Sequence, residues 1–479
     1  MLLIESEGKY SCYNVTMSIT LSFHGGVDGV TGSCYLLSAG GLNILIDCGF
    51  FQGGIETEQR NRSDFGFDPA SIDYLLLTHG HLDHCGRIPL LVKNGFRGKI
   101  ICTSATYDIA KIIMLDTAQI QEEDSAHWQK ISKRKGVEPP DPLYTILDAL
   151  DALRYFGDFA EYGKAVRLDD QVSVTFRDAG HILGASFLEI EAGKEKRIVF
   201  SGDLGNRNKP IIKDPQYPQK ADICIIEGTY SDRRHKDIET SVTELREAIL
   251  ETFARGGNVL IPSFAIERAQ DLLFYLSRMY YDNELPNCKV FLDSPMAISV
   301  NHVMRRHPEC FDEETQTLLK NNHNPLSFPG LHLTKTPDDS RKINYIGSRA
   351  VIIAGSGMCT GGRIKHHLKH NIWRKESSII FVGYQAEGTL GREIVDGEST
   401  VKIFDESYKV RAKVYTIGGF SAHADRDILL DWLKRCENPE HLFLVHGEKE
   451  ALASFEKEIK RDNLAREIHT PNLNQSYTL

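Results

Sequence analysis

Short apolar runs that end in a polar or glycine-rich corner recur along most of the chain. Most of them contain β-branched residues, a pattern typical of strands buried on both faces of a sheet. The predicted strands are residues 42–48, 73–79, 197–203, 222–227, 258–263, 289–293, 350–356, 378–384, 413–418 and 441–446. Helical patterns lie between several of them, at residues 240–254, 267–281 and 426–434. The pattern predicts an α/β protein with layered sheets and outer helices.

The regions without this pattern are few. Residues 130–142 are polar, basic and proline-containing, so we expect a surface loop there. Residues 1–16 precede the patterned region and look like an appendage. No apolar run approaches the roughly 20 residues of a membrane helix, and the first residues lack the pattern of a signal peptide. We therefore expect a cytoplasmic protein with no membrane partner.

Bulk composition narrows the picture only slightly. The 479 residues suggest two or more domains, and 41% hydrophobic with 25% charged residues is an ordinary globular balance. The net charge of −10 weighs against a nucleic-acid partner, although bound cations and a basic cluster at residues 363–375 would offset it. The ten cysteines include no C-x-x-C pair, and a chain of this size needs no disulfide scaffold.

The sharpest local signal is the segment His79-Gly80-His81-Leu82-Asp83-His84, directly after a predicted strand. Imidazole nitrogens and carboxylates are good zinc ligands, and ionisable groups that are buried need partners. A solvated histidine-rich turn is the alternative, but four metal-competent side chains in six residues argue against it. The sequence therefore predicts a metal site at the end of this strand.

Other predicted strands also end near metal-competent side chains, and the carboxyl ends of strands are where ligands gather in such folds. The candidates are His181, Asp203 and His446. Each alone would more often be a structural residue, but together with the histidine cluster they can complete two metal sites. Asp47, which ends another predicted strand, has the place of a carboxylate that orients a ligand histidine.

In order and spacing, Asp47, the segment 79–84, His181 and Asp203 resemble the four motifs of the metallo-β-lactamase superfamily. The resemblance implies a four-layer αββα sandwich that holds two zinc ions. One ion would be bound by His79, His81 and His181, the other by Asp83, His84 and His446, and Asp203 would bridge them. Manganese fits the same ligand types.

Three further motifs resemble the β-CASP branch of nucleic-acid hydrolases: Glu227 in IIEGTY, His423 in GGFSAHAD and His446 in VHGE. The similarity is close to bacterial RNA-degrading ribonucleases related to the eukaryotic pre-mRNA 3′-end cleavage endonuclease. In this branch a histidine at the third motif is associated with RNA. Segments 261–270, 292–297, 354–363 and 383–392 resemble its α/β cap domain.

The resemblance implies a domain division and a reaction. Residues 17–229 would form the first part of the lactamase domain, 230–408 the inserted cap, and 409–479 the return. Single-stranded RNA would be cleaved to 5′-phosphate and 3′-hydroxyl ends by a hydroxide that two zinc ions activate, with Asp83 and Asp203 in the catalytic set. His423 would be the general acid, and Glu227 would orient it. The resemblance leaves open whether the enzyme cuts as an endonuclease or an exonuclease, and whether it forms a homodimer.

Several cap residues are candidates for holding RNA phosphates, because backbone N–H groups after strands and arginine side chains bind anions. They are Ser263, Arg268, Ser356, Gly357, Arg363 and Arg392. A structural glycine turn or a surface arginine explains each of them equally well. The run from Arg363 to His370 is either a phosphate track or a solvated helix face, and the latter fits most of its members better.

Two other classes of function fit the sequence less well. A small-molecule hydrolase of the same superfamily, acting on thioesters or lactones, would need neither the long insertion nor Glu227 and His423. A non-catalytic scaffold would have lost metal ligands, whereas every expected ligand is present in this chain.

Overall fold

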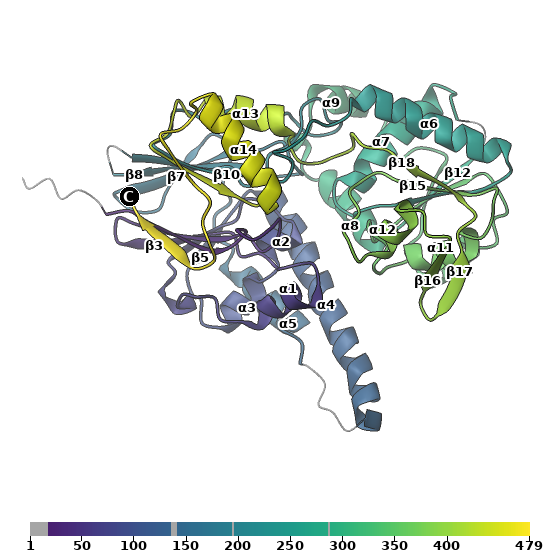
Figure 1. The fold of residues 1–479 in the computed structure, drawn as a ribbon, viewed down its shortest axis with the longest axis horizontal. Coiled ribbons are helices and arrows are strands. Elements are labelled where there is room, and N and C mark those ends of the chain that lie inside the picture. Colours follow the sequence, from purple (N-terminus) through teal and green to yellow (C-terminus); the bar gives the residue numbers. More distant parts are fainter. Residues whose placement is uncertain (1–17, 136–140, 194–195, 286–287) are drawn as a thin grey trace, which may run out of the picture.

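The computed structural model describes residues 18–135, 141–193, 196–285 and 288–479. The chain forms two lobes that lie side by side, a sheet sandwich and a cap (Figure 1). The expected appendage, residues 1–16, lies outside the described residues. Among the helices that the structure describes, none is both long enough and apolar enough to cross a bilayer.

Two sheets face each other in the sandwich lobe. The first has the strand order β21-β1-β2-β3-β4-β5, and the second has the order β20-β19-β10-β9-β8-β7-β6. The strands of the first sheet are β1 (Thr20–Gly25), β2 (Cys34–Ala39), β3 (Leu42–Ile46), β4 (Tyr74–Leu76), β5 (Lys99–Ile101) and β21 (Gln475–Thr478). Those of the second are β6 (Ala165–Arg167), β7 (Val172–Asp178), β8 (Ser186–Ala192), β9 (Lys196–Phe200), β10 (Ile223–Glu227), β19 (His441–Val445) and β20 (Glu467–His469).

The inner faces of the two sheets share one apolar core, which includes Phe23, Phe200 and Phe443. Helices cover both outer faces, with α13 and α14 on one side and α1, α2, α3 and α5 on the other (Figure 1). The helices of this lobe are α1 (Ile55–Gln59), α2 (Leu82–Cys85), α3 (Ile88–Lys93), α4 (Ser104–Lys135), α5 (Ile146–Ala152), α13 (Arg426–Lys434) and α14 (Lys449–Arg461). Four layers in the order α, β, β, α result, as predicted.

One prediction about the sandwich lobe is wrong. Residues 130–135 form the end of α4, not a loop, and residues 136–140 lie outside the described residues. Lysine, arginine and glutamine are good helix formers, so a helix can continue into solvent without an apolar face to guide it. The far half of α4 projects beyond the body of the lobe (Figure 1).

The cap is built on one parallel sheet with the order β13-β12-β14-β11-β15-β18. Its strands are β11 (Val259–Pro262), β12 (Lys289–Asp293), β13 (Leu331–Leu333), β14 (Ala350–Ala354), β15 (Ser378–Phe381) and β18 (Lys413–Thr416), and β16 (Thr400–Ile403) pairs with β17 (Glu406–Lys409) in a hairpin. Since β18 begins after residue 408, the cap sheet extends into residues 409–479, the segment that was expected to return to the lactamase domain.

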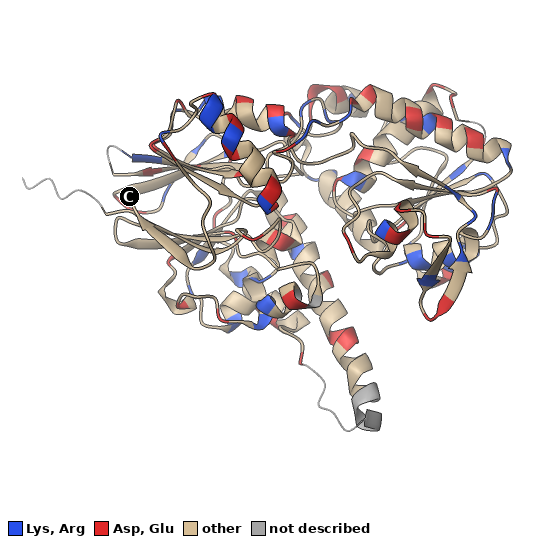
Figure 2. Cartoon of the chain, in the orientation of Figure 1, with Lys and Arg blue, Asp and Glu red and all other residues tan. Residues whose placement is uncertain are grey.

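Helices cover both faces of the cap sheet, because its strands are apolar on both sides. Leu260 packs with residues of α11 and α12, whereas Val259 and Ile261 pack with residues of α6 and α7. The cap helices are α6 (Ile238–Ala254), α7 (Arg268–Tyr281), α8 (Pro295–Met304), α9 (Glu313–Lys320), α10 (Pro337–Ile343), α11 (Ile364–Asn371) and α12 (Leu390–Val395). Figure 2 shows the charged residues mainly on helices and loops, with both signs interspersed.

Candidate metal centre

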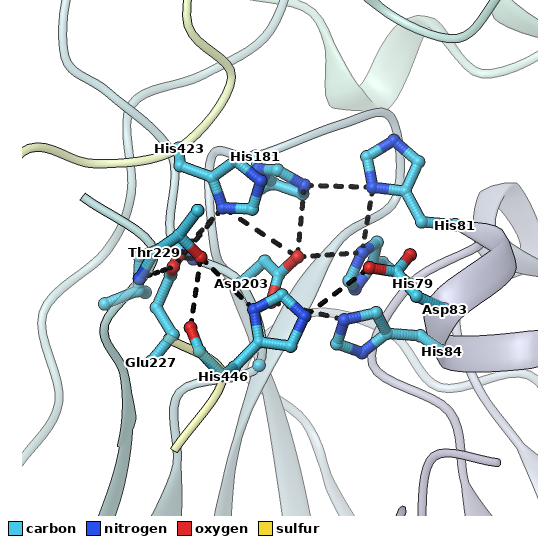
Figure 3. A network of polar contacts seen from close by, with 12 residues as sticks. His79, His81, Asp83, His84, His181, Asp203, Glu227, Thr229, His423 and His446 are labelled. Carbon is cyan, nitrogen blue, oxygen red and sulfur yellow. Dashed lines mark hydrogen bonds and ion pairs between the residues drawn. The ribbon is translucent and has the colours of Figure 1, made fainter. Parts of the chain in front are cut away.

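The candidate ligands meet where strands of both sandwich sheets end. β9, β10 and β19 run parallel, so the residues that follow them reach one edge of the second sheet. Asp203 follows β9, and His446 follows β19. His181 lies in the loop after β7, and the segment 79–84 follows β4 and enters the short helix α2. Figure 3 shows all seven candidate ligands around one point.

Close approach of two loops makes this convergence possible. Gly205 lies so near the loop before His181 that a Cβ atom on it would stand 1.6 Å from the carbonyl oxygen of Gly180. The backbone N–H of Gly205 donates to the carbonyl oxygen of Ala179. Only glycine fits this position. The close approach of the two loops that it permits places Asp203 beside His181.

The ligand atoms form two groups. Atoms of His79, His81, His181 and Asp203 all lie within 4.8 Å of one another, and so do those of Asp83, His84 and His446. In the first group, Nδ1 of His81 is 3.1 Å from Nε2 of His79 and 3.1 Å from Nε2 of His181. In the second, Nε2 of His446 is 3.5 Å from Oδ2 of Asp83.

Asp203 lies between the two groups and turns one oxygen to each. Its Oδ2 is 3.4 Å from Nε2 of His79 and 3.6 Å from that of His181. Its Oδ1 is 3.3 Å from Nε2 of His84 and 3.5 Å from Nδ1 of His446. This is the position that a carboxylate needs to bind two ions at once.

Several buried atoms at this point lack the partners that buried polar groups need. Both oxygens of Asp203 and Nε2 of His446 are buried without a hydrogen bond. Buried polar atoms almost always have a partner in folded proteins. Nitrogen and carboxylate donors in this number fit a pair of divalent cations, which would satisfy these atoms.

The protonation states of most of these residues favour metal binding. Burial lowers the pKa of His81 to about 4 and that of His79 well below its usual value, so the imidazole lone pairs are free. Burial alone would raise the pKa of Asp203, but the histidines around it, His446 and His84 first, hold it well below its usual range. His79, His81 and Asp203 are therefore in the forms that bind a cation. Burial alone would lower the pKa of His84, but the charges of Asp203 and Asp47 outweigh it and raise the pKa well above its usual value, so a bound ion must displace a proton there.

Asp47 holds one ligand in place. Its Oδ2 is 2.7 Å from Nδ1 of His84, and the Thr78 backbone N–H and hydroxyl donate to its two oxygens at 2.8 Å. Asp47 has a φ of 58°, and His446 has a φ of 49°. Left-handed backbone is uncommon for residues other than glycine, although aspartate and histidine adopt it more readily than most.

Glu227 and His423 lie beside the metal-ligand groups. Nδ1 of His423 is 3.3 Å from Oε2 of Glu227 and 3.9 Å from Oδ2 of Asp203. The backbone N–H of Leu204 donates to Oε1 of Glu227 at 2.6 Å, which fixes the carboxylate. Burial alone would lower the pKa of His423, but the charges of Glu227 and Asp203 outweigh it and raise the pKa above its usual value.

Two residues of this centre were missed by the sequence analysis. The hydroxyl of Thr229 lies 3.2 Å from Nδ1 of His446, and its backbone N–H donates to Glu227 (Figure 3). Nζ of Lys209 donates to the carbonyl oxygen of His181 at 3.3 Å and pairs with Glu267 at the start of α7, so it links the ligand loop to the cap. The one signal in the sequence that could have pointed to Thr229 was its position two residues after Glu227 in the segment IIEGTY.

None of the cap candidates belongs to the metal-ligand groups, and the structure shows what the three arginines contact. Arg363 donates to Asp293, Thr334 and Lys335, and Arg268 is buried and donates to Val382. Arg392 pairs with Asp396 on the surface. Ser263, Ser356 and Gly357 lie in the loops after β11 and β14.

The basic run after Arg363 has mixed surroundings. His367 is fully buried, and its Nε2 is 2.6 Å from Oδ2 of Asp293. Lys369 pairs with Glu406 of β17. The run therefore does not present all its side chains to one surface.

Family models match three parts of the chain. Residues 27–252 match the metallo-beta-lactamase superfamily, residues 269–394 the Beta-Casp domain, and residues 407–471 the Zn-dependent metallo-hydrolase RNA specificity domain. A solved structure of a protein of unknown function from Enterococcus faecalis has the same fold, with a TM-score of 0.55, 14% sequence identity, and coverage of 96% of this chain and 100% of the other.

Three curated relatives each match about nine tenths of this chain. Ribonuclease TTHA0252 of Thermus thermophilus is 41% identical, over 89% of this chain and 93% of the relative. Transcription termination factor FttA of Methanocaldococcus jannaschii is 31% identical, over 92% and 69%. An RNase J-like protein of the same organism is 29% identical, over 91% and 94%. This chain therefore belongs to the β-CASP branch of the metallo-β-lactamase superfamily.

Proposed function

We propose that the chain is a metal-dependent ribonuclease that hydrolyses phosphodiester bonds of single-stranded RNA and leaves 5′-phosphate and 3′-hydroxyl ends. The observation that carries the proposal is the Glu227–His423 pair, 3.3 Å apart, directly beside two groups of metal-competent side chains. The Thermus thermophilus relative is named a ribonuclease, and the model matched by residues 407–471 is named for RNA specificity.

Two zinc ions fit the donor atoms, and manganese fits the same donor types. His79, His81 and His181 would hold one ion, Asp83, His84 and His446 the other, with Asp203 shared. When bound, two divalent ions neutralise charge on the phosphate and activate water for attack on phosphorus. Asp47 keeps His84 turned toward its ion through the hydrogen bond at Nδ1.

His423 would donate a proton to the departing 3′ oxygen. Its Nδ1 faces Glu227, which leaves Nε2 as the atom that meets the substrate. The side chain of His423 is 20% exposed, whereas that of Glu227 is 1% exposed, so only the histidine reaches a ligand. Glu227 would position the ring and favour its charged form.

The cap would hold the RNA strand against the metal centre. The loop that contains Ser263 also carries Phe264, which is 46% exposed, and Tyr384 after β15 is 55% exposed. Exposed aromatic rings stack on the bases of single strands. Backbone N–H groups near Gly357 and the guanidinium of Arg392 would hold phosphates, while Arg268 and Arg363 would act indirectly by fixing these loops through their contacts within the cap.

A small-molecule hydrolase would make no use of a proton donor held by Glu227 or of a cap domain. A scaffold would not keep seven metal-competent side chains around one point. Both remain alternative outcomes of the test below. We further propose that the protein acts in the cytoplasm, and a homodimer stays a prediction.

The test is cleavage of end-labelled single-stranded RNA, with DNA of the same sequence as control, by zinc-loaded or manganese-loaded protein. We expect RNA products with 5′-phosphate and 3′-hydroxyl ends. His423→Ala should slow cleavage by about 10²–10⁴-fold without loss of metal, and the exposed His302→Ala should not change it. Intact RNA with the metal-loaded protein would refute the proposal, and hydrolysis of a thioester instead would favour the small-molecule alternative.

A further inference from the structure

A second group of metal-competent side chains lies at the opposite end of β19 from the metal centre. His441 begins β19, and Glu467 and His469 are the first and last residues of β20. One ligand atom of each lies within 4.8 Å of the others. His446, a ligand candidate of the metal centre, follows the other end of β19, about 16 Å away at 3.3 Å per residue.

Strand geometry puts the three side chains on one face of the sheet. Glu467 and His469 are two residues apart, so they point the same way. The parallel register pairs His441 with Glu467, and Phe443 with His469. Phe443 is fully buried between the two sheets, so the shared face is the inner one. The ring of His469 stacks on Phe443, with centroids 4.8 Å apart.

The separations fit the coordination shell of one small cation. Nδ1 of His441 is 3.3 Å from both Nε2 of His469 and Oε2 of Glu467, and the last two atoms are 3.7 Å apart. Tetrahedral zinc with bonds of about 2.0–2.1 Å places its ligand atoms about 3.3–3.4 Å apart. The observed triangle is close to one face of such a tetrahedron, which leaves the fourth position for water.

Nδ1 of His441 and Nε2 of His469 are within hydrogen-bond distance of each other, and among the described residues no lysine or arginine pairs with Glu467. The nearby cations Lys196 and Arg466 both turn to Glu440, at 2.6 Å and 3.8 Å. Burial lowers the pKa of His469, and the charge of His441 lowers it further against the opposing effect of Glu467, so a doubly charged histidine pair is disfavoured.

We propose that His441, Glu467 and His469 bind one divalent transition-metal ion, with zinc the best fit, separately from the catalytic centre. The ion would join β19 to β20, which is an edge strand of three residues. His469 also packs against Tyr477 of β21, with ring centroids 5.1 Å apart. The ion would therefore fasten the end of the chain to both sheets of the sandwich and serve a structural role.

The test compares the metal content and melting temperature of full-length wild type with those of Glu467→Gln and His469→Gln. Glu467 is 63% exposed, so its amide variant should keep the fold. His332→Gln is the matched control, because His332 also stacks on a phenylalanine, at 5.2 Å, but belongs to no group of ligand atoms among the described residues. Each protein is titrated with zinc and analysed by elemental analysis after gel filtration.

We expect both site variants to bind one zinc fewer than wild type and His332→Gln, and to lose the rise in melting temperature that the last equivalent of zinc produces. The same loss of one equivalent should occur when Glu467→Gln is made in Asp203→Ala protein, which separates this site from the catalytic centre. Equal zinc content in wild type and Glu467→Gln, or a single lost equivalent without any change in the melting curve, would overturn the proposal.

Discussion

Asp47 offers a sharp test of how the metal centre is held, because its carboxylate contacts a ligand histidine and touches no other candidate ligand in the two groups. Its removal leaves three buried donors, Nδ1–H of His84 and the backbone N–H and hydroxyl of Thr78, without their acceptor. An unsatisfied buried donor costs about 1–3 kcal/mol. Replacing a carboxylate that supports a ligand usually weakens metal affinity by about 10–100-fold, or about 1.4–2.7 kcal/mol.

The left-handed backbone of Asp47, with a φ of 58°, decides which substitution is informative. Asp47→Gly removes the carboxylate without adding backbone strain. Asp47→Ala removes the same group and adds about 1–2 kcal/mol of strain. Asp47→Asn keeps one oxygen and suits left-handed backbone, so it should lose less metal affinity than the other two.

The assay is zinc affinity, measured by competition with a chromophoric chelator, together with chemical unfolding of the metal-free protein. We expect affinity to fall about 10–100-fold in Asp47→Gly and Asp47→Ala, with Asp47→Ala the less stable of the two. If Asp47→Gly binds zinc as tightly as wild type, then His84 does not depend on Asp47 for its orientation and the reasoning is wrong.

Three further predictions concern neighbouring residues. Asp203→Ala should lose metal and RNA cleavage together, and elemental analysis showing full metal content would contradict its shared position. Thr229→Val removes the hydroxyl 3.2 Å from Nδ1 of His446 and should weaken metal binding by about 10-fold or more in the same chelator assay; unchanged affinity would assign the hydroxyl no role. Burial raises the pKa of Asp178 from 3.8 to about 7, so the folded state holds a proton that the unfolded chain releases. Stability should then fall by about 1.4 kcal/mol per pH unit between about pH 4 and 7. Asp178→Asn keeps an acceptor for Gly180 and should lack this fall, which urea unfolding at pH 5, 6 and 7 will show; parallel pH profiles would refute it.

The strands that were predicted are present, and the candidate ligands stand near their ends, for a local reason; other strands, such as β1, β2 and β8, were not predicted. Each predicted strand is present, and most are shorter at the carboxyl end, where residues such as Asp203 and His446 leave the sheet. Apolar runs specify buried strands over a few residues, and polar residues that end them must lie at a sheet edge. No long-range information is needed for either inference.

Partners that come from distant segments could not be predicted in this way. Arg363 was a phosphate candidate, but its guanidinium pairs with Asp293, 70 residues away in sequence, once β12 and β14 lie side by side. The length of α4 escaped prediction because its last turns carry no apolar periodicity. The group around His441 was missed because its members meet only through the register of β19 and β20.

The order of the ligands along the chain has a consequence for synthesis. The segment 79–84, His181 and Asp203 all precede the cap, whereas His446 follows it in the strand β19 that pairs with β10. A nascent chain that has emerged only as far as the cap has no His423 and no His446. On the proposed mechanism, the ribosome must therefore finish almost the whole polypeptide before the candidate metal centre and its proton donor are complete.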